Sequence, residues 1–340
     1  MNAGTRTKFA TWTDASPVEQ AVISGGALTA TLLSWGALVQ DLRLDGHPSP
    51  LVLGFREFAH YPLYSQFFGA TAGRYANRIR GGRFEIDGVE YQADTNFFGK
   101  HLLHGGANGT YRRNWALVEL APDKAVFRLE DRDGEMGFPG NCELVVGYAC
   151  RPSGTLAIEM TATTDRPTLV NLAHHSYFNL DGGPDTRDHE LRIEASAYLP
   201  VDDELIPTGE VRSVVGTDFD FRESRPIRRE IDGRQVVYDH NFCVSPQRVA
   251  PRPMVTVQSR KSGIRMTVTS GEPGLQFYAG HKISTPVPGL MGAPYGAYGG
   301  ICLEPQIWPD SPHHPHFPQA ILRPGETYRQ VTEYAFSRMA

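Results

Sequence analysis

Apolar and polar side chains alternate over short stretches of this chain, and most of these stretches end at residues that form turns. The clearest examples are residues 156–163, LAIEMTAT, and residues 191–197, LRIEASA. Successive side chains of a β-strand point to opposite faces, so a strand with one buried face requires this period of two. Helical periodicity occurs only in short pieces, near residues 56–65. The pattern therefore predicts an all-β protein.

Turn formers join several of these predicted strands into hairpins. The Asp-Gly pair at 87–88 separates residues 84–86 from residues 89–91, and Asp-Gly readily takes the positive φ angles of a two-residue hairpin turn. A Ser-Gly pair at 262–263 stands in a similar place before residues 264–268. The 35 glycines and 25 prolines among 340 residues suit many strands and tight turns, and they argue against a bundle of long helices.

No low-complexity linker, sharp change in composition or repeat of fixed period divides the chain. We therefore expect one domain spanning residues 1–340. Because two stacked sheets bury the apolar face of each, many antiparallel strands in one large domain predict a large antiparallel β-sandwich with few short helices. A β-propeller is the alternative, but the chain lacks the repeat that its blades require.

Charge and hydropathy exclude several classes of partner. With 33 Lys and Arg against 38 Asp and Glu, the formal net charge of -5 leaves no excess of cations for nucleic acid or an anionic membrane. No run of some 18 apolar residues, roughly the minimum for a spanning helix, is present. The four cysteines form no CxxC pair, which indicates reduced thiols. We expect a cytoplasmic protein, either monomer or homodimer, with no nucleic-acid or membrane partner.

Five segments contain more polar side chains than structure alone requires. A sugar site needs such groups, because every hydroxyl both donates and accepts, and a polar group left unpaired after burial costs about 1–3 kcal/mol. Aromatic neighbours such as Tyr177 and Phe178 could pack on the apolar face of a sugar ring. The five segments are residues 73–78, 103–106, 171–180, 238–242 and 303–306.

Each of these residues also has a structural interpretation when it is taken alone. His104, before two glycines, suits a turn as well as catalysis. Arg78 suits an ion-paired surface, and Asp239 suits a turn cap. Glu304 follows an apolar run that resembles a buried strand, where a carboxylate either forms a structural ion pair or takes part in chemistry.

The histidines also have both a structural and a functional interpretation. His174 and His175 are adjacent, so on a strand they point opposite ways and only one is expected to face a site. The loop with His313, His314 and His316 suggests a metal site, but it has no carboxylate or cysteine at the spacing of a zinc motif. We therefore expect a solvated loop and no bound metal there.

Together and in this order, the five segments resemble the aldose 1-epimerase family, also called galactose mutarotases. The resemblance implies the family's large antiparallel β-sandwich, the galactose mutarotase-like supersandwich. It also implies an isomerase that interconverts the α and β anomers of a small-molecule aldose such as galactose or glucose. The likeness extends over nearly the whole chain, through residues 34–37, 53–55, 198–202, 206–209 and 322–326.

The resemblance also implies roles for single residues. Glu304 matches the family's general base, His175 matches its general acid, and His104 would assist at the sugar ring. No hydride or electron moves in this reaction, so we expect no cofactor and no metal. The chain departs from the common pattern at His174 and in residues 289–300, which leaves the sugar preference open. The residues that match positions holding the sugar, or flanking the acid, are Asn77, Arg78, Ser176, Tyr177, Asp239 and Gln276.

Two other functions stay open at this point. A β-sandwich with aromatic and amide contacts could be a non-catalytic carbohydrate-binding module, which would need no buried base and acid placed together. A relative acting on a phosphorylated hexose would need more cations than Arg74 and Arg78 supply. For the epimerase, Glu304 must be ionised while His175 is protonated. Burial opposes this state, and we expect the attraction between the two groups to prevail once the sugar is bound.

Overall fold

Antiparallel sheets dominate the structure, a computed structural model that describes residues 2–65 and 67–339. Within these residues the one α-helix, α1 (His60–Tyr64), has five residues and lies inside the stretch with helical periodicity. The prediction of an all-β chain is therefore confirmed. Four single 3-10 turns complete the helical elements of the described residues: η1 (Arg80–Gly82), η2 (Thr110–Arg112), η3 (Glu135–Gly137) and η4 (Ser311–His313).

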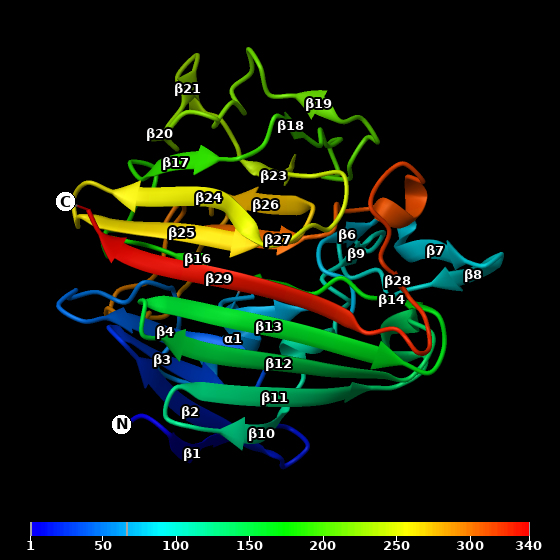
Figure 1. Ribbon diagram of the computed structural model, residues 1–340, viewed down its shortest axis with the longest axis horizontal. Coiled ribbons are helices and arrows are strands. Elements are labelled where there is room, and N and C mark those ends of the chain that lie inside the picture. The colour runs from blue at the N-terminus through cyan, green and yellow to red at the C-terminus, as the bar shows by residue number, and fades with distance from the viewer. Residues whose placement is uncertain (1, 66, 340) are drawn as a thin grey trace.

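The largest sheet has nine strands and runs across the whole molecule (Figure 1). Its buried apolar positions lie mainly on one face, because the period of two continues in register from strand to strand, as between β12 and β13. The strands, in their order across the sheet, are β10 (Ala116–Leu120), β11 (Lys124–Asp131), β12 (Cys142–Arg151), β13 (Thr155–Thr164), β29 (Tyr328–Arg338), β25 (Ile264–Ser270), β24 (Arg252–Ser259), β17 (Glu190–Ile193) and β20 (Arg225–Pro226).

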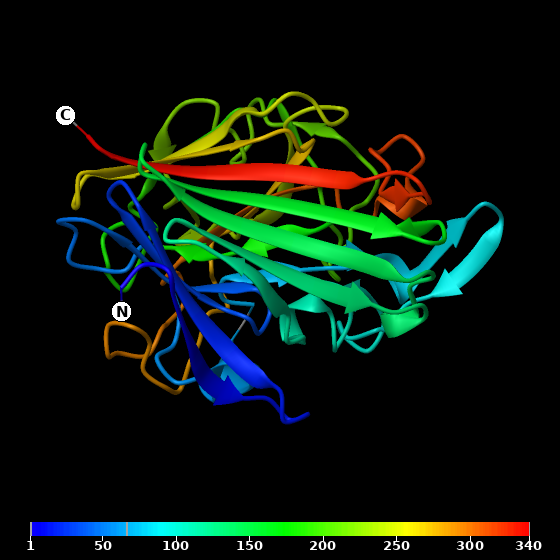
Figure 2. The same ribbon diagram turned by 60° about the horizontal axis from the view of Figure 1, so that its bottom comes forward.

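Two further sheets cover this apolar face side by side (Figures 1 and 2). The four-stranded sheet packs on β11 and β12, and the six-stranded sheet packs under β24, β25 and β29, where Phe178 lies 4.9 Å from Tyr334 between ring centroids. The first contains β1 (Thr5–Thr11), β2 (Pro17–Gly25), β3 (Leu28–Leu33) and β4 (Leu38–Leu44). The second contains, in order, β16 (Tyr177–Phe178), β27 (Ile301–Gln306), β26 (Gly274–Tyr278), β23 (Asp239–Cys243), β18 (Ala197–Tyr198) and β19 (Arg212–Ser213).

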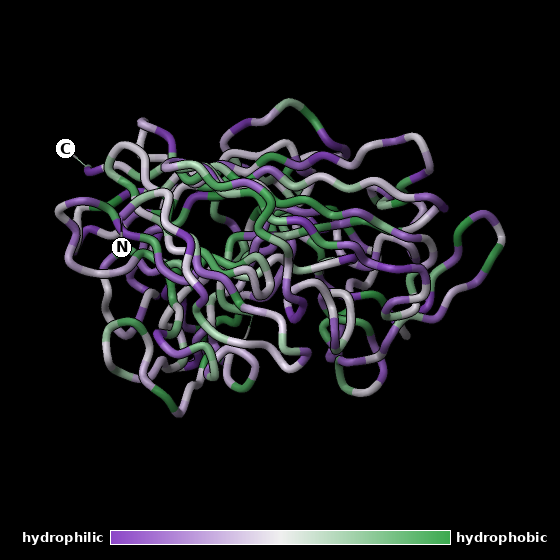
Figure 3. Tube along the Cα trace, turned by 90° about the horizontal axis from the view of Figure 1, so that it is seen from below, coloured by the Kyte–Doolittle hydropathy of each residue, from purple (hydrophilic) through white to green (hydrophobic). Residues whose placement is uncertain are grey.

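The core lies between these layers. Buried side chains from all three sheets form one continuous hydrophobic cluster. In Figure 3 the hydrophobic segments gather along the strands in the middle of the view, whereas the outer loops are largely hydrophilic. Burial of apolar area at about 25 cal/mol per Å² makes this stacking the main stabilising term. The predicted β-sandwich is confirmed.

The predicted hairpins are found, with one difference. Strands β7 (Arg83–Ile86) and β8 (Val89–Gln92) are joined by Asp87 and Gly88, whose φ angles of 53° and 79° are those of a two-residue primed turn. Strands β24 and β25 pair up to Ser259 and Ile264, so their loop has four residues and not two. The predicted strand over residues 191–197 is divided, because β17 ends at Ile193 and β18 joins another sheet.

Further two-stranded ribbons complete the sheets, and two of them carry His175, Arg78 and Leu103 into the site. The ribbon that contains β15 lies against β27. No helix in the part of the chain that the structure describes is long and apolar enough to cross a membrane. The paired strands are β5 (Ala70–Ala72) with β15 (Ala173–His175), β6 (Arg78–Ile79) with β9 (Leu102–Leu103), β14 (Thr168–Leu169) with β28 (Ile321–Leu322), and β21 (Glu230–Ile231) with β22 (Arg234–Gln235).

Candidate active site

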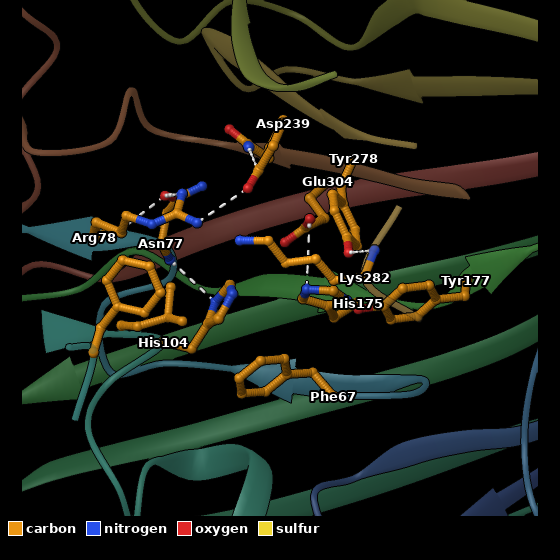
Figure 4. Close-up of a pocket in the computed structure, with 13 residues that line it drawn as sticks. Phe67, Asn77, Arg78, His104, His175, Tyr177, Asp239, Tyr278, Lys282 and Glu304 are labelled. Carbon is orange, nitrogen blue, oxygen red and sulfur yellow. Dashed lines mark hydrogen bonds and ion pairs between the residues drawn. The ribbon is translucent and has the colours of Figure 1, made fainter. Parts of the chain in front are cut away.

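A pocket of about 210 Å³ lies between the six-stranded sheet and the ribbons of β15 and β6 (Figure 4). All five polar segments of the sequence, far apart along the chain, contribute at least one residue to it. Most of its polar side chains come from strands or strand ends, which hold them in fixed directions. The lining residues are Phe67, Asn77, Arg78, Phe97, Leu103, His104, His175, Tyr177, Asp239, Gln276, Tyr278, Lys282 and Glu304.

Strand alternation decides which side chains enter the pocket. On β27, Leu303 belongs to the hydrophobic core, so its neighbour Glu304 points to the opposite face and lines the pocket. On β15, His175 lines the pocket, whereas the Nε2 atom of His174 lies 2.7 Å from Ser176 Oγ, away from it. The expectation that only one of the two adjacent histidines faces a site is therefore confirmed.

Glu304 and His175 form a buried pair of ionisable groups in the pocket. Glu304 Oε1 lies 3.7 Å from His175 Nε2, and the two side chains are only 2% and 5% exposed (Figure 4). The second carboxyl oxygen, Glu304 Oε2, is buried without a hydrogen-bond partner among the described residues. Because an unpaired buried polar atom costs about 1–3 kcal/mol, this oxygen is suited to a ligand hydroxyl.

The protonation of this pair follows from its burial. Burial raises the pKa of Glu304 well above its ordinary value, and the charge of Asp239 adds to the effect while Arg78 opposes it. Burial lowers the pKa of His175 to about 4. Both shifts favour neutral forms, so the substrate-free pair keeps its one shared proton on the carboxyl group. Burial thus prevails over the attraction between the two groups when no sugar is bound.

His104 lies at a turn and in the site at once. Its φ of 49° is followed by Gly105, where a Cβ would come within 1.8 Å of the Gly73 carbonyl oxygen, so only glycine fits. The Asn77 amide donates to His104 Nδ1 at 3.1 Å. An amide N–H can only donate, so the neutral ring must hold its hydrogen on Nε2. Burial lowers the pKa of His104 well below its ordinary value, so the ring presents an uncharged N–H donor.

Arg78 and Asp239 (Figure 4) form a buried polar chain with Gln276 in the pocket. Arg78 Nη2 donates to Asp239 Oδ2 at 3.1 Å, and Gln276 Nε2 donates to Asp239 Oδ1 at 2.7 Å. Burial acts to raise the pKa of Asp239, but the Arg78 charge and its hydrogen bond help to hold that pKa below its ordinary value. The Arg78 guanidinium also lies 4.9 Å from the centre of the Phe97 ring. Donors and acceptors thus alternate here, as sugar hydroxyls require.

The sequence of this chain is similar to known proteins over nearly its whole length. The family model described as aldose 1-epimerase matches residues 19–335, almost the whole chain. The chain belongs to the aldose 1-epimerase family. It is 39% identical to the galactose mutarotase of Bos taurus over 95% of both chains. It is 38% identical to the aldose 1-epimerase of Escherichia coli (strain K12), over 92% of this chain and 93% of that protein.

Solved structures give the same answer. A crystal structure of an aldose epimerase homologue from C. elegans matches with a TM-score of 0.87 and 34% identity, over 94% of this chain and all of that one. The galactose 1-epimerase of Lactobacillus acidophilus matches with a TM-score of 0.85 and 26% identity, over 99% of both chains. The supersandwich fold implied by the sequence resemblance is confirmed.

Two residues expected at the site lie elsewhere. Ser176 does not line the pocket, because strand alternation turns it to the side of His174. Phe178 packs in the core against Tyr334 and cannot reach a sugar in the pocket. Tyr177, between them, does line the pocket. The period of two, applied from His175 onward, predicts all three outcomes.

Several pocket residues were not singled out from the sequence. Tyr278 is two positions after Gln276 on β26, so strand alternation could have indicated it. Phe67 lies in a loop, with its ring 4.6 Å from that of His104 and 5.3 Å from that of His175 between centroids. Lys282 follows β26 and reaches into the pocket (Figure 4). Loop residues such as these carry no periodic signal. The remaining lining residues are Phe97 and Leu103, and Leu103 is an apolar member of the polar segment 103–106.

The pocket contains three side chains of the types that bind metal ions. Among the described residues, His104, His175 and Glu304 are the only group of three potential ligands, with atoms within 4.8 Å of one another. A histidine that binds metal donates its other ring N–H to an acceptor. His104 Nδ1 instead accepts from the Asn77 backbone amide. The lone pair of the neutral ring is therefore used on Nδ1, and Nε2, which carries the hydrogen, has none to offer a metal in the pocket.

The histidine loop serves the structure of the chain. His313 Nδ1 lies 2.6 Å from Asp310 Oδ1, and His314 Nε2 lies 3.4 Å from Asp310 Oδ2. Asp310, fully buried, also accepts from the Arg80 amide at 2.8 Å. Asp310 thus holds two histidines of the loop and a backbone amide of another segment, and these contacts anchor the loop.

Proposed function

We propose that the protein interconverts the α and β anomers of free aldoses, galactose, glucose or a similar sugar, with Glu304 as base and His175 as acid. The observation that carries this proposal is the buried pair with 3.7 Å between Glu304 Oε1 and His175 Nε2, in a pocket that also contains hydrogen-bond partners for hydroxyl groups. The names of the relatives, galactose mutarotase and aldose 1-epimerase, support it over nearly the full length of the chain.

Anomer exchange needs two proton transfers. The Glu304 carboxylate takes the proton of the C1 hydroxyl while His175 Nε2–H gives a proton to the ring oxygen O5. The C1–O5 bond breaks and its electron pair stays on O5, while the pair left on O1 by the departing proton forms the second C1–O1 bond of the open-chain aldehyde. Rotation about C1–C2 presents the other face of the aldehyde, and the same transfers in reverse close the ring. Each positioned group contributes about 10²–10⁴-fold to the rate.

The substrate-free pair already contains the proton that this mechanism requires. A protonated Glu304 beside a neutral His175 holds the same number of protons as an ionised Glu304 beside an imidazolium. The active form is therefore reached by moving one proton between two atoms 3.7 Å apart, with no exchange with solvent. Sugar hydroxyls that bond to the charged forms favour this move, because hydrogen bonds to an ion are stronger than those to a neutral group.

The other polar residues bind and orient the sugar in this proposal. His104 Nε2–H donates to an oxygen of the sugar ring, which fits its locked tautomer. Asn77, Arg78, Asp239 and Gln276 hold hydroxyls remote from C1. The four cysteines are buried and unpaired, which supports a reducing compartment such as the cytoplasm.

Polarimetry on freshly dissolved α-D-galactose, α-D-glucose and a pentose tests the proposal. The rotation of at least one of these sugars is expected to relax faster with the protein than in buffer alone. Buffer-like relaxation of every sugar, together with measurable sugar binding, would show a carbohydrate-binding protein instead. Loss of the acceleration in Glu304→Gln, with binding retained, would place the chemistry at this pocket.

A phosphorylated aldose remains a second candidate substrate, and one observation favours it. Arg74 cannot contribute, because it is buried and bonded to Asp131 at 2.8 Å. Lys282, however, adds a cation at the pocket (Figure 4). The ratio of kcat/KM for galactose 6-phosphate to that for galactose tests this candidate in Lys282→Met, with Lys124→Met, at the exposed first residue of β11, as the control. A ratio unchanged by Lys282→Met would exclude a phosphate contact with Lys282.

A further inference from the structure

Cys302 is a buried group beside the reacting pair that the mechanism above does not use. It lies on β27 two residues before Glu304, so both side chains point to the same face of the strand. Cys302 is fully buried, and its Sγ atom lies 3.5 Å from His175 Nδ1. The imidazole ring therefore has Glu304 at one nitrogen and Cys302 at the other.

The remaining surroundings of the His175 ring are aromatic. Phe67 lies 5.3 Å from it and Tyr177 lies 5.1 Å from it, measured between ring centroids. The His104 ring approaches at 5.0 Å with an angle of 75° between the planes. Within residues 2–65 and 67–339, the Cys302 thiol is the one side chain that forms a hydrogen bond with the His175 ring. A side chain that fixes the hydrogen on this ring must therefore be that thiol or Glu304.

The protonated carboxyl of Glu304 determines which ring nitrogen carries the hydrogen. A carboxyl O–H that faces Nε2 needs a lone pair there, because two donors pointing at each other repel. The neutral ring must then hold its hydrogen on Nδ1, where sulfur is the side-chain acceptor within reach. Burial raises the pKa of the Cys302 thiol well above its ordinary value, so the acceptor is an uncharged thiol.

We propose that Cys302 is a positioning residue for the acid: its sulfur accepts the Nδ1–H of His175 and so keeps the Nε2 lone pair directed at Glu304. This inference rests on the proposed function, in which Nε2 takes a proton from Glu304 and passes it to O5. A thiol suits this place because it is a weak, neutral acceptor. A carboxylate in its place would also fix Nδ1–H, but it would stabilise the charged ring and oppose proton release.

The tautomer can be observed without any turnover. Nitrogen-15 NMR at pH 7, where a ring with a pKa of about 4 is neutral, distinguishes a protonated from an unprotonated ring nitrogen. The His175 signals are identified by their loss in His175→Asn. The wild type is expected to carry its hydrogen on Nδ1, Cys302→Ala is expected to shift the population toward Nε2–H, and Cys302→Ser is expected to restore Nδ1–H. Cys150→Ala, at a cysteine buried on β12, is the control for loss of volume.

Kinetics give the second measurement. A hydrogen bond of ordinary strength corresponds to a factor of about three to ten, so Cys302→Ala is expected to lower kcat by that factor with KM changed less than about twofold. Cys302→Ser is expected to recover kcat to within about twofold of wild type. Should Cys302→Ala fail to fold, the wild-type spectrum and the serine variant still decide the question.

Three results would overturn the proposal. They are a wild-type ring with its hydrogen on Nε2, a Cys302→Ala variant with an unchanged spectrum, and a loss of kcat that serine does not restore. A wild type that shows no mutarotation would instead contradict the proposed function, while the NMR comparison would remain decisive for the tautomer.

Discussion

Replacing Glu304 by Gln tests both the proposed base and the electrostatics of its burial. The variant keeps nearly the same shape but cannot ionise, so mutarotation is expected to fall by at least about 10²-fold, the lower end of what a positioned base contributes. Sugar binding is expected to survive, because the amide can still bond to a hydroxyl. A variant that keeps most of its turnover would remove Glu304 from the mechanism.

The same variant is expected to gain stability relative to wild type as the pH rises. Burial raises the pKa of Glu304 in the folded protein, so this group's contribution to the folded state is fully present only below its unfolded pKa of ~4.3, and it is lost as the pH rises through the folded pKa. Within that window, each pH unit costs the wild type about 1.4 kcal/mol that the Glu304→Gln variant does not lose. The free energy of unfolding of the variant minus that of wild type should therefore increase with pH from about pH 5 upward.

Urea denaturation at pH 4.5, 5.5 and 6.5 measures this difference. Glu130, exposed on β11, provides the control: Glu130→Gln is expected to change neither activity nor the pH dependence of stability. A stability difference between Glu304→Gln and wild type that stays constant, or falls, over this range would refute the reasoning. A constant difference would mean that the carboxyl group has the same pKa in the folded and the unfolded chain. A falling difference would mean that folding lowers that pKa.

Three further predictions concern the rest of the pocket. Arg78→Met leaves the Asp239 carboxylate buried without its cation, so urea denaturation should show a loss of about 3 kcal/mol, most of which the double variant with Asp239→Asn restores; a loss below about 1 kcal/mol would contradict a buried ion pair. A plot of kcat/KM against pH should be bell-shaped with an acid limb near pH 4, where His175 gains a second ring proton, and a limb retained in His175→Asn would belong to another group. Exhaustive chelation should leave activity unchanged, whereas a loss restored by zinc would make His104, His175 and Glu304 a metal site.

The sequence determined the features that depend on neighbours along the chain. The alternation over residues 156–163 appears as β13, with one face in the core, because a strand's side-chain period is fixed by its backbone. Asp87 and Gly88 form the predicted turn because few other residues take positive φ at two successive positions. The polar segments also supplied most of the pocket, including His175 and Glu304.

Only the tertiary structure decided which of these segments are in contact and which protonation states their side chains adopt there. Cys302 and His175 are separated by 127 positions in the chain, and no local pattern predicts their contact. Lys282 reaches the pocket from a loop, whose path depends on packing and not on a period. The neutral state of Glu304 beside a neutral imidazole follows from the removal of water by surrounding side chains, mostly from other strands. Residue types are set by the sequence, but desolvation is a property of the assembled fold, and it fixes where the proton rests.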